Sequence, residues 1–270
     1  QRLQTRRETL TAAHPDVTMI IHTGHRQQRN GRRDHRFRAD SNALYLAGVH
    51  EPGATLALPA GGEPVLFLSE RSPSKTHWEG ALPDWSEIAT WSGIADIRPA
   101  HELPGALPDL IGNASDVAWS RGQHHTLDHL LIEQTGTPRR GRFLPGLLDL
   151  RGMLAPLRMK KDAEEIALMR EVGAATARAH LALMKQARVG DTGVMLAARF
   201  QAALAAAGIR ECAFDGIFAL GEQGTCLHPA PDATRVLGEG DLVLVDAGGE
   251  HPGGYASDQT RGFPVSGGFT

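Results

Sequence analysis

The sequence predicts an α/β domain followed by an α+β domain, and three observations support this. The chain has 270 residues, enough for two domains of ordinary size that each bury a core. Its first half alternates short apolar runs with turns and helical stretches. Its second half begins with two helical patterns and continues with strand-like runs. We place the two domains at residues 1–155 and 156–270.

Four short apolar or β-rich runs in the first half, separated by Gly, Pro and His, predict strands. They are DVTMII (16–21), NALYLAGV (42–49), ATLALP (54–59) and EPVLFLS (63–69). Helices are expected at 1–14, 74–80 and 124–134. Pro156 and the basic residues after it mark the domain boundary, because proline disfavours a helix through itself and a strong helix pattern starts next.

The second half opens with a strong helix signal. Asp162 and Glu165 form the acidic version of a capping box. One face of this helix is expected to pack inward, because six residues recur at helical spacing, namely Ile166, Met169, Gly173, Thr176, His180 and Leu183. A second helix is predicted from Thr192 to the C-terminal cap Gly208. Three strand-like runs follow, namely CAFDGIFAL (212–220), DLVLVDAG (241–248) and GYASDQTRGFPV (254–265).

The composition is that of a globular protein without a global bias toward nucleic acid or membrane. Net charge is −3, with 41% hydrophobic and 22% charged residues. No apolar run approaches the roughly 20 residues that span a bilayer. Two cysteines cannot form a disulfide framework or a four-thiolate zinc site, so we expect a reducing compartment and a cytoplasmic location. The arginine-rich stretch 25–38 is interpreted as a solvated loop rather than a nucleic-acid site.

Two aspartates, Asp246 and Asp258, flank a glycine-rich turn between two strand-like runs. We expect the turn to bring the carboxylates together, where they repel unless a proton, a cationic side chain or a metal lies between them. Oxygen ligands favour Mn²⁺ or Mg²⁺, with Zn²⁺ and Co²⁺ not excluded. The alternative is a hairpin in which one acid caps a turn and the other pairs with Arg261. His228 is either a solvated turn residue or a donor to a developing oxyanion.

Four stretches in order resemble the front part of the catalytic domain of the Xaa-Pro aminopeptidases (aminopeptidase P), in the pita-bread metallopeptidase superfamily. They are KKDAEEIALMREVG, FALGEQGTCLH, GEGDLVLVDAGG and YASDQTRGFPVSGGFT. RFRADSNALYLAGVHEPGATLALP resembles that family's creatinase-like N-terminal domain. The resemblance implies an α/β N-terminal domain plus the first part of an α+β pita-bread catalytic domain.

The resemblance also implies roles for individual residues. Asp246 matches an aspartate that chelates one of two divalent metal ions, and Asp258 matches the aspartate that bridges both; manganese is the expected metal. His228 matches a catalytic histidine beside the substrate. Trp78 resembles a tryptophan that helps to form the substrate site of a neighbouring subunit, although a core position is the alternative. The implied reaction hydrolyses peptides with proline at the second position, in a homo-oligomer (dimer or tetramer).

The sequence departs from the family pattern in three ways. The interval from Asp246 to Asp258 is one residue longer than usual, and Pro229 follows His228 where tyrosine is common. The family's remaining ligands, one histidine and two glutamates, lie on downstream segments outside these 270 residues. We therefore expect an incomplete catalytic domain that is weakly active or inactive. The alternatives are a prolidase (Xaa-Pro dipeptidase) and a non-catalytic peptide-binding or scaffold protein on the same fold.

Overall fold

The computed structural model describes residues 1–70, 72, 76–77, 80–112, 114–136 and 144–269. The chain divides into two compact units, Gln1–Lys160 and Lys161–Thr270, each with its own hydrophobic core. The boundary expected between residues 155 and 156 falls inside helix α7 (Leu150–Met159), which contains Pro156 and lies in the first unit. None of the helices in the described ranges has the length and apolar character needed to cross a bilayer.

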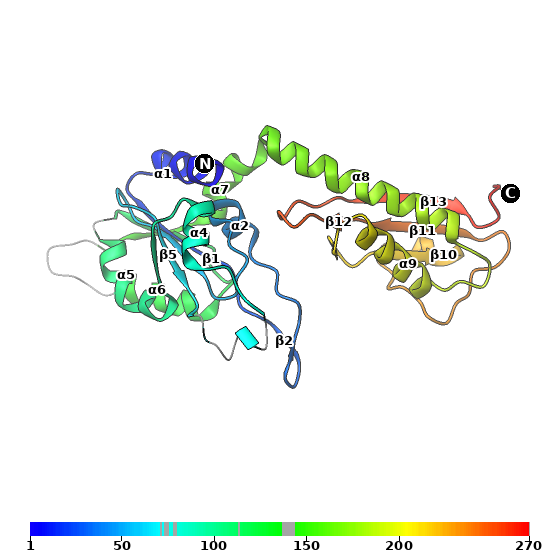
Figure 1. Ribbon diagram of the computed structural model, residues 1–270, viewed down its shortest axis with the longest axis horizontal. Helices are drawn as coiled ribbons and strands as arrows, with labels where there is room; N and C mark the ends of the chain where they lie inside the picture. Colours follow the sequence, from blue (N-terminus) through cyan, green and yellow to red (C-terminus); the bar gives the residue numbers. More distant parts are fainter. Residues whose placement is uncertain (71, 73–75, 78–79, 113, 137–143, 270) are drawn as a thin grey trace. The chain divides into compact units, whose positions relative to one another are not determined.

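A six-stranded mixed sheet forms the centre of the first unit (Figure 1). In spatial order its strands are β6 (Asp96–Pro99), β5 (Val65–Leu68), β4 (Thr55–Leu58), β1 (Val17–His22), β7 (Asp116–Trp119) and β8 (Gly146–Asp149). Strand β1 pairs in parallel with β7 and antiparallel with β4. The strands predicted at 16–21, 54–59 and 63–69 correspond to β1, β4 and β5.

Helices cover both faces of this sheet, and its central strands are therefore buried on both sides. Side chains alternate along a strand, so Met19 and Ile21 of β1 join one core cluster and Ile20 joins the other. The first cluster receives residues from α1 (Arg2–Ala13), α2 (Ser41–Ala47), α4 (Trp85–Ser92) and α7. The second receives residues from α5 (Leu103–Ile111), which follows the short helix η1 (Ala100–Glu102), and from α6 (His125–Gly136). The predicted helices at 1–14 and 124–134 are confirmed; most of 74–80 lies outside the described residues.

The strand predicted at 42–49 is wrong, because most of this segment belongs to helix α2 (Ser41–Ala47). The Asp40 side chain accepts hydrogen bonds from the backbone N–H groups of Asn42 and Ala43, which satisfies donors at the helix start. Gly48, with φ of 65°, closes the helix in the left-handed conformation. The apolar run that suggested a strand is buried in the first core cluster, where a short helix and a strand give the same pattern.

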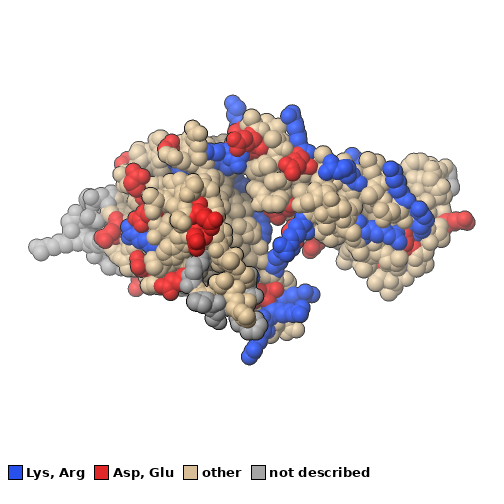
Figure 2. Space-filling view, viewed as in Figure 1, with Lys and Arg blue, Asp and Glu red and all other residues tan. Residues whose placement is uncertain are grey.

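The arginine-rich stretch 25–38 is exposed as expected, but it contains a hairpin rather than only a loop. Strands β2 (Gln28–Asn30) and β3 (Arg33–Asp34) pair antiparallel, and every residue of both is exposed. Figure 2 shows Lys and Arg side chains gathered where β2 lies in Figure 1. The segment is therefore a solvated, strongly basic ribbon.

The second unit packs two helices against one face of a three-stranded antiparallel sheet (Figure 1). The helices are α8 (Ala163–Gln186) and α9 (Gly193–Ala206), and the sheet order is β10 (Ile217–Leu220), β11 (Leu242–Ala247) and β13 (Gln259–Pro264). Two further strands, β9 (Glu211–Cys212) and β12 (Gly249–Glu250), pair beside it, and η2 (Gly221–Thr225) follows β10. The predicted capping box is confirmed, since Asp162 accepts from the Glu165 N–H and Glu165 accepts from the Asp162 N–H, both at 2.8 Å.

Candidate metal centre

Strand β11 fixes the direction of Asp246. Val243, Val245 and Ala247 are buried in the core formed with α8 and α9. Because successive side chains of a strand point to opposite faces, Asp246 projects from the other face of the sheet. It pairs with Ile217 of β10 and Thr260 of β13. The carboxylate therefore leaves the middle strand of the sheet, on the side away from the helices.

The chain returns to this point through residues 248–257, where Glu250 and Ala256 form an antiparallel bridge, and reaches Asp258. Gly248 has almost no room for a side chain, since a Cβ atom there would lie 1.6 Å from the Ser257 carbonyl oxygen. The Ser257 N–H donates to the Gly249 carbonyl at 2.9 Å, which closes the turn. Glycine at position 248 thus allows the two backbone segments to approach, and this places Asp258 beside Asp246.

The electrostatics indicate two carboxyl groups in contact. Loss of hydration, a hydrogen bond to Asp246 and the negative charge of Asp246 together raise the pKa of the Asp258 carboxyl. Oδ1 of Asp246 is buried and has no hydrogen-bond partner in the described structure. A hydrogen bond between two carboxyl groups requires a proton, so the pair can hold either a shared proton or a cation.

The alternative hairpin with an Arg261 ion pair is not what the structure forms. Arg261 donates to the backbone carbonyl of Thr260 at 2.7 Å, and over the described ranges it makes no ion pair with either aspartate. The buried, unpartnered oxygen of Asp246 and the raised pKa of Asp258 fit a hard divalent cation, for which carboxylate oxygens are suitable ligands. Within the described part of the chain, no group of three or more His, Cys, Asp or Glu side chains is arranged to hold a metal ion.

No contact with the aspartates is recorded for His228 within the described residues. His228 follows η2 in an exposed segment and forms no hydrogen bond or ion pair within the described residues. Trp78 lies outside the described residues. Asp246 and Asp258 are therefore the two sequence-predicted site residues that the structure places together.

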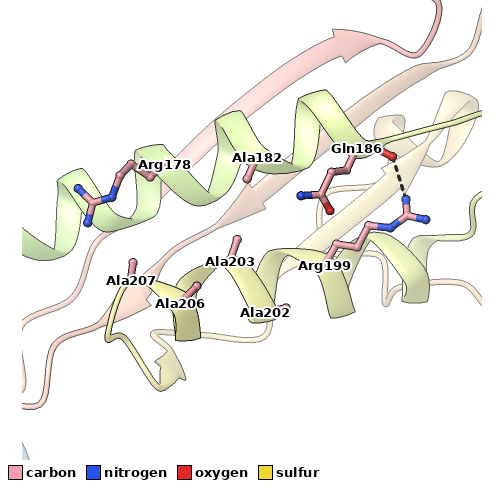
Figure 3. Close-up of a pocket in the computed structure, with 8 residues that line it drawn as sticks. All are labelled: Arg178, Ala182, Gln186, Arg199, Ala202, Ala203, Ala206 and Ala207. Atoms are coloured by element: carbon pink, nitrogen blue, oxygen red, sulfur yellow. Dashed lines mark hydrogen bonds between the residues drawn. The ribbon is translucent and has the colours of Figure 1, made fainter.

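A separate groove of about 480 Å³ lies between α8 and α9 (Figure 3). Its floor is made of alanines, and Arg178, Gln186 and Arg199 border it. Arg199 is already engaged, since it donates to the Gln186 carbonyl at 3.2 Å and pairs with Asp191. None of the candidate site residues lines this groove.

Helix α8 supplies polar contacts near the aspartates that sequence analysis did not identify. Thr176 and His180, interpreted from the sequence as packing positions, bond to the backbone of β12 and β11, respectively. Glu165, identified only as a cap, also accepts a hydrogen bond of 2.6 Å from the Tyr255 hydroxyl. The sequence signal that could have indicated these contacts is the presence of polar residues on the predicted buried face of the helix, because buried polar groups need hydrogen-bond partners.

Comparison with known families identifies both units. Residues 3–119 match the family described as "Aminopeptidase P, N-terminal domain", and residues 167–270 match "Metallopeptidase family M24". The two matches place an aminopeptidase P N-terminal domain and an M24 metallopeptidase domain in this order along the chain. The predicted fold class, an α/β N-terminal domain plus the first part of a pita-bread domain, is confirmed by these matches.

Relatives and solved structures agree with these two matches. The Xaa-Pro aminopeptidase of Escherichia coli is 29% identical over 100% of this chain and 63% of the relative, and that of Haemophilus influenzae is 28% identical over 95% and 58%. A mitochondrial relative of Arabidopsis thaliana, intermediate cleaving peptidase 55, is 28% identical over 87% and 46%. The structure of proline aminopeptidase P II from Yersinia pestis is 31% identical, with a TM-score of 0.93 over 100% of this chain and 64% of that chain. The chain thus spans less than two thirds of the length of these relatives.

A zinc-substituted aminopeptidase P of E. coli in complex with product is similar as well. It is 28% identical, with a TM-score of 0.93 over 100% of this chain and 63% of that chain. The M24 match implies divalent metal ions, and this neighbour was solved in a zinc-substituted form.

Proposed function

We propose that the whole protein is a metal-dependent aminopeptidase that hydrolyses the bond between an amino-terminal residue and proline. The observation that carries the proposal is the carboxylate pair, in which Asp246 has a buried, unpartnered oxygen and Asp258 has a raised pKa. The family matches support the same reaction class.

Asp246 and Asp258 are the proposed metal ligands of this chain, and manganese is the proposed metal. When bound, two divalent ions would polarise the substrate carbonyl and lower the pKa of a water molecule. The aspartates hold negative charge on one side of the sheet, where it attracts cations. His228 is the proposed donor of a hydrogen bond to the substrate, and its exposed segment leaves the imidazole accessible.

Manganese binding tests the carboxylate pair directly. We expect the 270-residue chain to bind Mn²⁺, measured by electron paramagnetic resonance of free Mn²⁺, and Asp246→Asn to weaken binding at least tenfold because one ligand charge is lost. Asp109→Asn, which removes an exposed carboxylate of the first unit, is the matched control. Equal binding by Asp246→Asn and the wild type would rule out this site.

We also propose that residues 1–270 alone turn over substrate slowly or not at all. The described residues offer two adjacent carboxylates and no larger ligand group, so a dinuclear centre would lack ligands. Elemental analysis together with hydrolysis of a Gly-Pro-led peptide tests this. Two tightly bound Mn²⁺ per chain with rapid cleavage would contradict it.

Two alternatives remain distinct from this proposal. A prolidase would prefer Xaa-Pro dipeptides, so turnover of Gly-Pro against a longer Gly-Pro-led peptide by the whole protein separates the two. A non-catalytic binding protein on this fold would bind such peptides without cleaving them. The Asp246 and Asp258 pair favours catalysis, because adjacent carboxylates are costly to keep where no cation binds them.

The remaining proposals concern the setting of the enzyme. Its proposed partners are peptides with proline at the second position and further copies of itself, as a dimer or tetramer, which analytical ultracentrifugation of the whole protein would test. Trp78 is proposed to contribute to the substrate site of a neighbouring subunit. A cytoplasmic location is proposed from the free cysteines Cys212 and Cys226, which suit a reducing compartment.

A further inference from the structure

The residue that follows each aspartate is tied to helix α8. After Asp246, the backbone carbonyl of Ala247 accepts a hydrogen bond from Nε2 of His180 at 3.1 Å. After Asp258, Nε2 of Gln259 donates to the backbone carbonyl of Gly173 at 3.0 Å. The two strand segments that carry the carboxylates are therefore held by one helix.

A third contact lies between these two. The Gly249 N–H donates to Oγ1 of Thr176 at 3.1 Å, and Thr176 is fully buried. Gly173, Thr176 and His180 are three and four residues apart, which places them on one face of α8. We call these three residues the α8 seam. Its three contacts reach Ala247, Gly249 and Gln259, which bracket the turn between the aspartates.

The donor at His180 is fixed by its surroundings. The side chain is 3% exposed and packs edge to face on Phe200, with ring centroids 5.0 Å apart. A backbone carbonyl can only accept, so Nε2 must carry the hydrogen. Because the imidazole is buried, loss of the hydrogen bond to Ala247 would cost free energy that water cannot restore. This contact therefore holds the end of β11 in one position.

Two like charges on adjacent strands push those strands apart, whereas a shared cation requires them at one spacing. The α8 seam opposes the separation from the far side of the sheet, through the backbone next to each carboxylate. Outer partners of this kind orient ligands and commonly change metal affinity 10–100-fold. We infer that Thr176 and His180, with Gln259, are positioning residues that set the spacing of Asp246 and Asp258 for a divalent cation. The inference rests on the proposed metal site.

The substitutions Thr176→Val and Thr176→Ser separate positioning from packing. Valine keeps the shape of threonine but removes the acceptor for the Gly249 N–H, whereas serine keeps the acceptor and removes a buried methyl group. We expect Thr176→Val to raise the Mn²⁺ dissociation constant of the 270-residue chain about tenfold. Thr176→Ser should stay within about twofold of the wild type although it also loses packing. A purely structural role would make the two variants follow their thermal unfolding midpoints instead.

Amide hydrogen exchange gives a readout without metal. In Thr176→Val, exchange at residues 246–249 and 258–260 should rise about tenfold, while that of α9 stays at the wild-type level. Gln259→Met removes the donor to the Gly173 carbonyl from a less buried side chain and should raise exchange at 258–260. This variant provides the test if Thr176→Val does not fold.

The outcomes distinguish the inference from the proposed function. Mn²⁺ binding that Asp246→Asn does not weaken overturns the metal site. Binding that depends on Asp246 but is unchanged in Thr176→Val overturns the positioning role. Unchanged exchange in both Thr176→Val and Gln259→Met overturns it as well, whether or not Mn²⁺ binds.

Discussion

At the scale of single residues, His22 at the end of β1 is held in its neutral form. Its Nδ1 accepts a hydrogen bond of 2.8 Å from the Gly24 N–H, so this nitrogen cannot take a proton without losing the bond. The rings of His25 and His124 lie 4.6 Å and 4.5 Å from the His22 ring, centroid to centroid. Burial, followed by the charges of His124 and His25, lowers the pKa of His22 to about 3.

This depressed pKa predicts acid sensitivity of the first unit. In the unfolded chain His22 titrates near pH 6.5, so above that pH it contributes no pH dependence. As the pH falls from about 6.5 to about 3, His22 becomes protonated in the unfolded chain but stays neutral in the native state. The free energy of unfolding therefore falls by up to about 1.4 kcal/mol per pH unit. All four tryptophans lie in residues 1–160, so tryptophan fluorescence during urea unfolding at pH 7, 6 and 5 reports this unit.

The control for this prediction is a second histidine. His22→Phe should flatten the dependence on pH, whereas replacing the exposed His129 by glutamine should leave it as in the wild type. An equal slope in wild type and His22→Phe would show that other groups cause the acid sensitivity.

The sequence predicted the carboxylate pair but not what surrounds it. A strand that runs into a glycine-rich turn predicts where Asp246 and Asp258 go, because the turn returns the chain to the same edge. The contacts of His22 with His124, and of His180 with Ala247, join residues 102 and 67 positions apart in the chain. Local pattern carries no signal for such pairs, so they could be found only in the fold.

At the scale of elements, Gly248 controls how β11 and β13 meet. We expect Gly248→Ala to destabilise the second unit by about 3 kcal/mol or more, because its Cβ would overlap the Ser257 carbonyl oxygen at 1.6 Å. Gly262→Ala in β13 is the matched control, since a Cβ there meets nothing within 4 Å. Loss of the far-ultraviolet circular dichroism signal with urea measures both variants, and similar midpoints for the two would contradict the steric argument.

For helix α8 the start was predicted correctly, whereas its buried face was predicted only in part. The Asp162 and Glu165 box gave the start of α8 correctly. Its inward face was only partly right, because Thr176, His180 and Leu183 are buried while Ile166 and Met169 are 39% and 41% exposed. Periodicity identifies a helix face, but which end of a 24-residue helix is covered depends on the elements that pack against it.

At the scale of the whole molecule, the order of elements was enough to predict the fold class. An α/β arrangement followed by two helices and strands is present, and the two family matches follow the same order along the chain. The boundary depends on finer information. The sequence suggested residue 155, next to Pro156, whereas contacts divide the chain after Lys160. Helix α7 continues through Pro156 to Met159, although an interior proline removes one helical hydrogen bond and crowds the preceding turn.

The boundaries after residue 155 and after Lys160 predict different stabilities for fragments of the first unit. A fragment of residues 1–160 keeps the Leu157 carbonyl, which accepts from the Tyr45 hydroxyl at 3.3 Å, and Arg158, whose Nη1 donates to Asn42 Oδ1 at 2.5 Å. A fragment of residues 1–155 loses both and leaves the buried Asn42 side chain without that donor. We expect the free energy of unfolding of the 1–155 fragment to be about 1–3 kcal/mol lower than that of the 1–160 fragment, measured by tryptophan fluorescence in urea. If both fragments had the same midpoint, the end of α7 would not belong to the folded unit, and the boundary at 155 would be the better one.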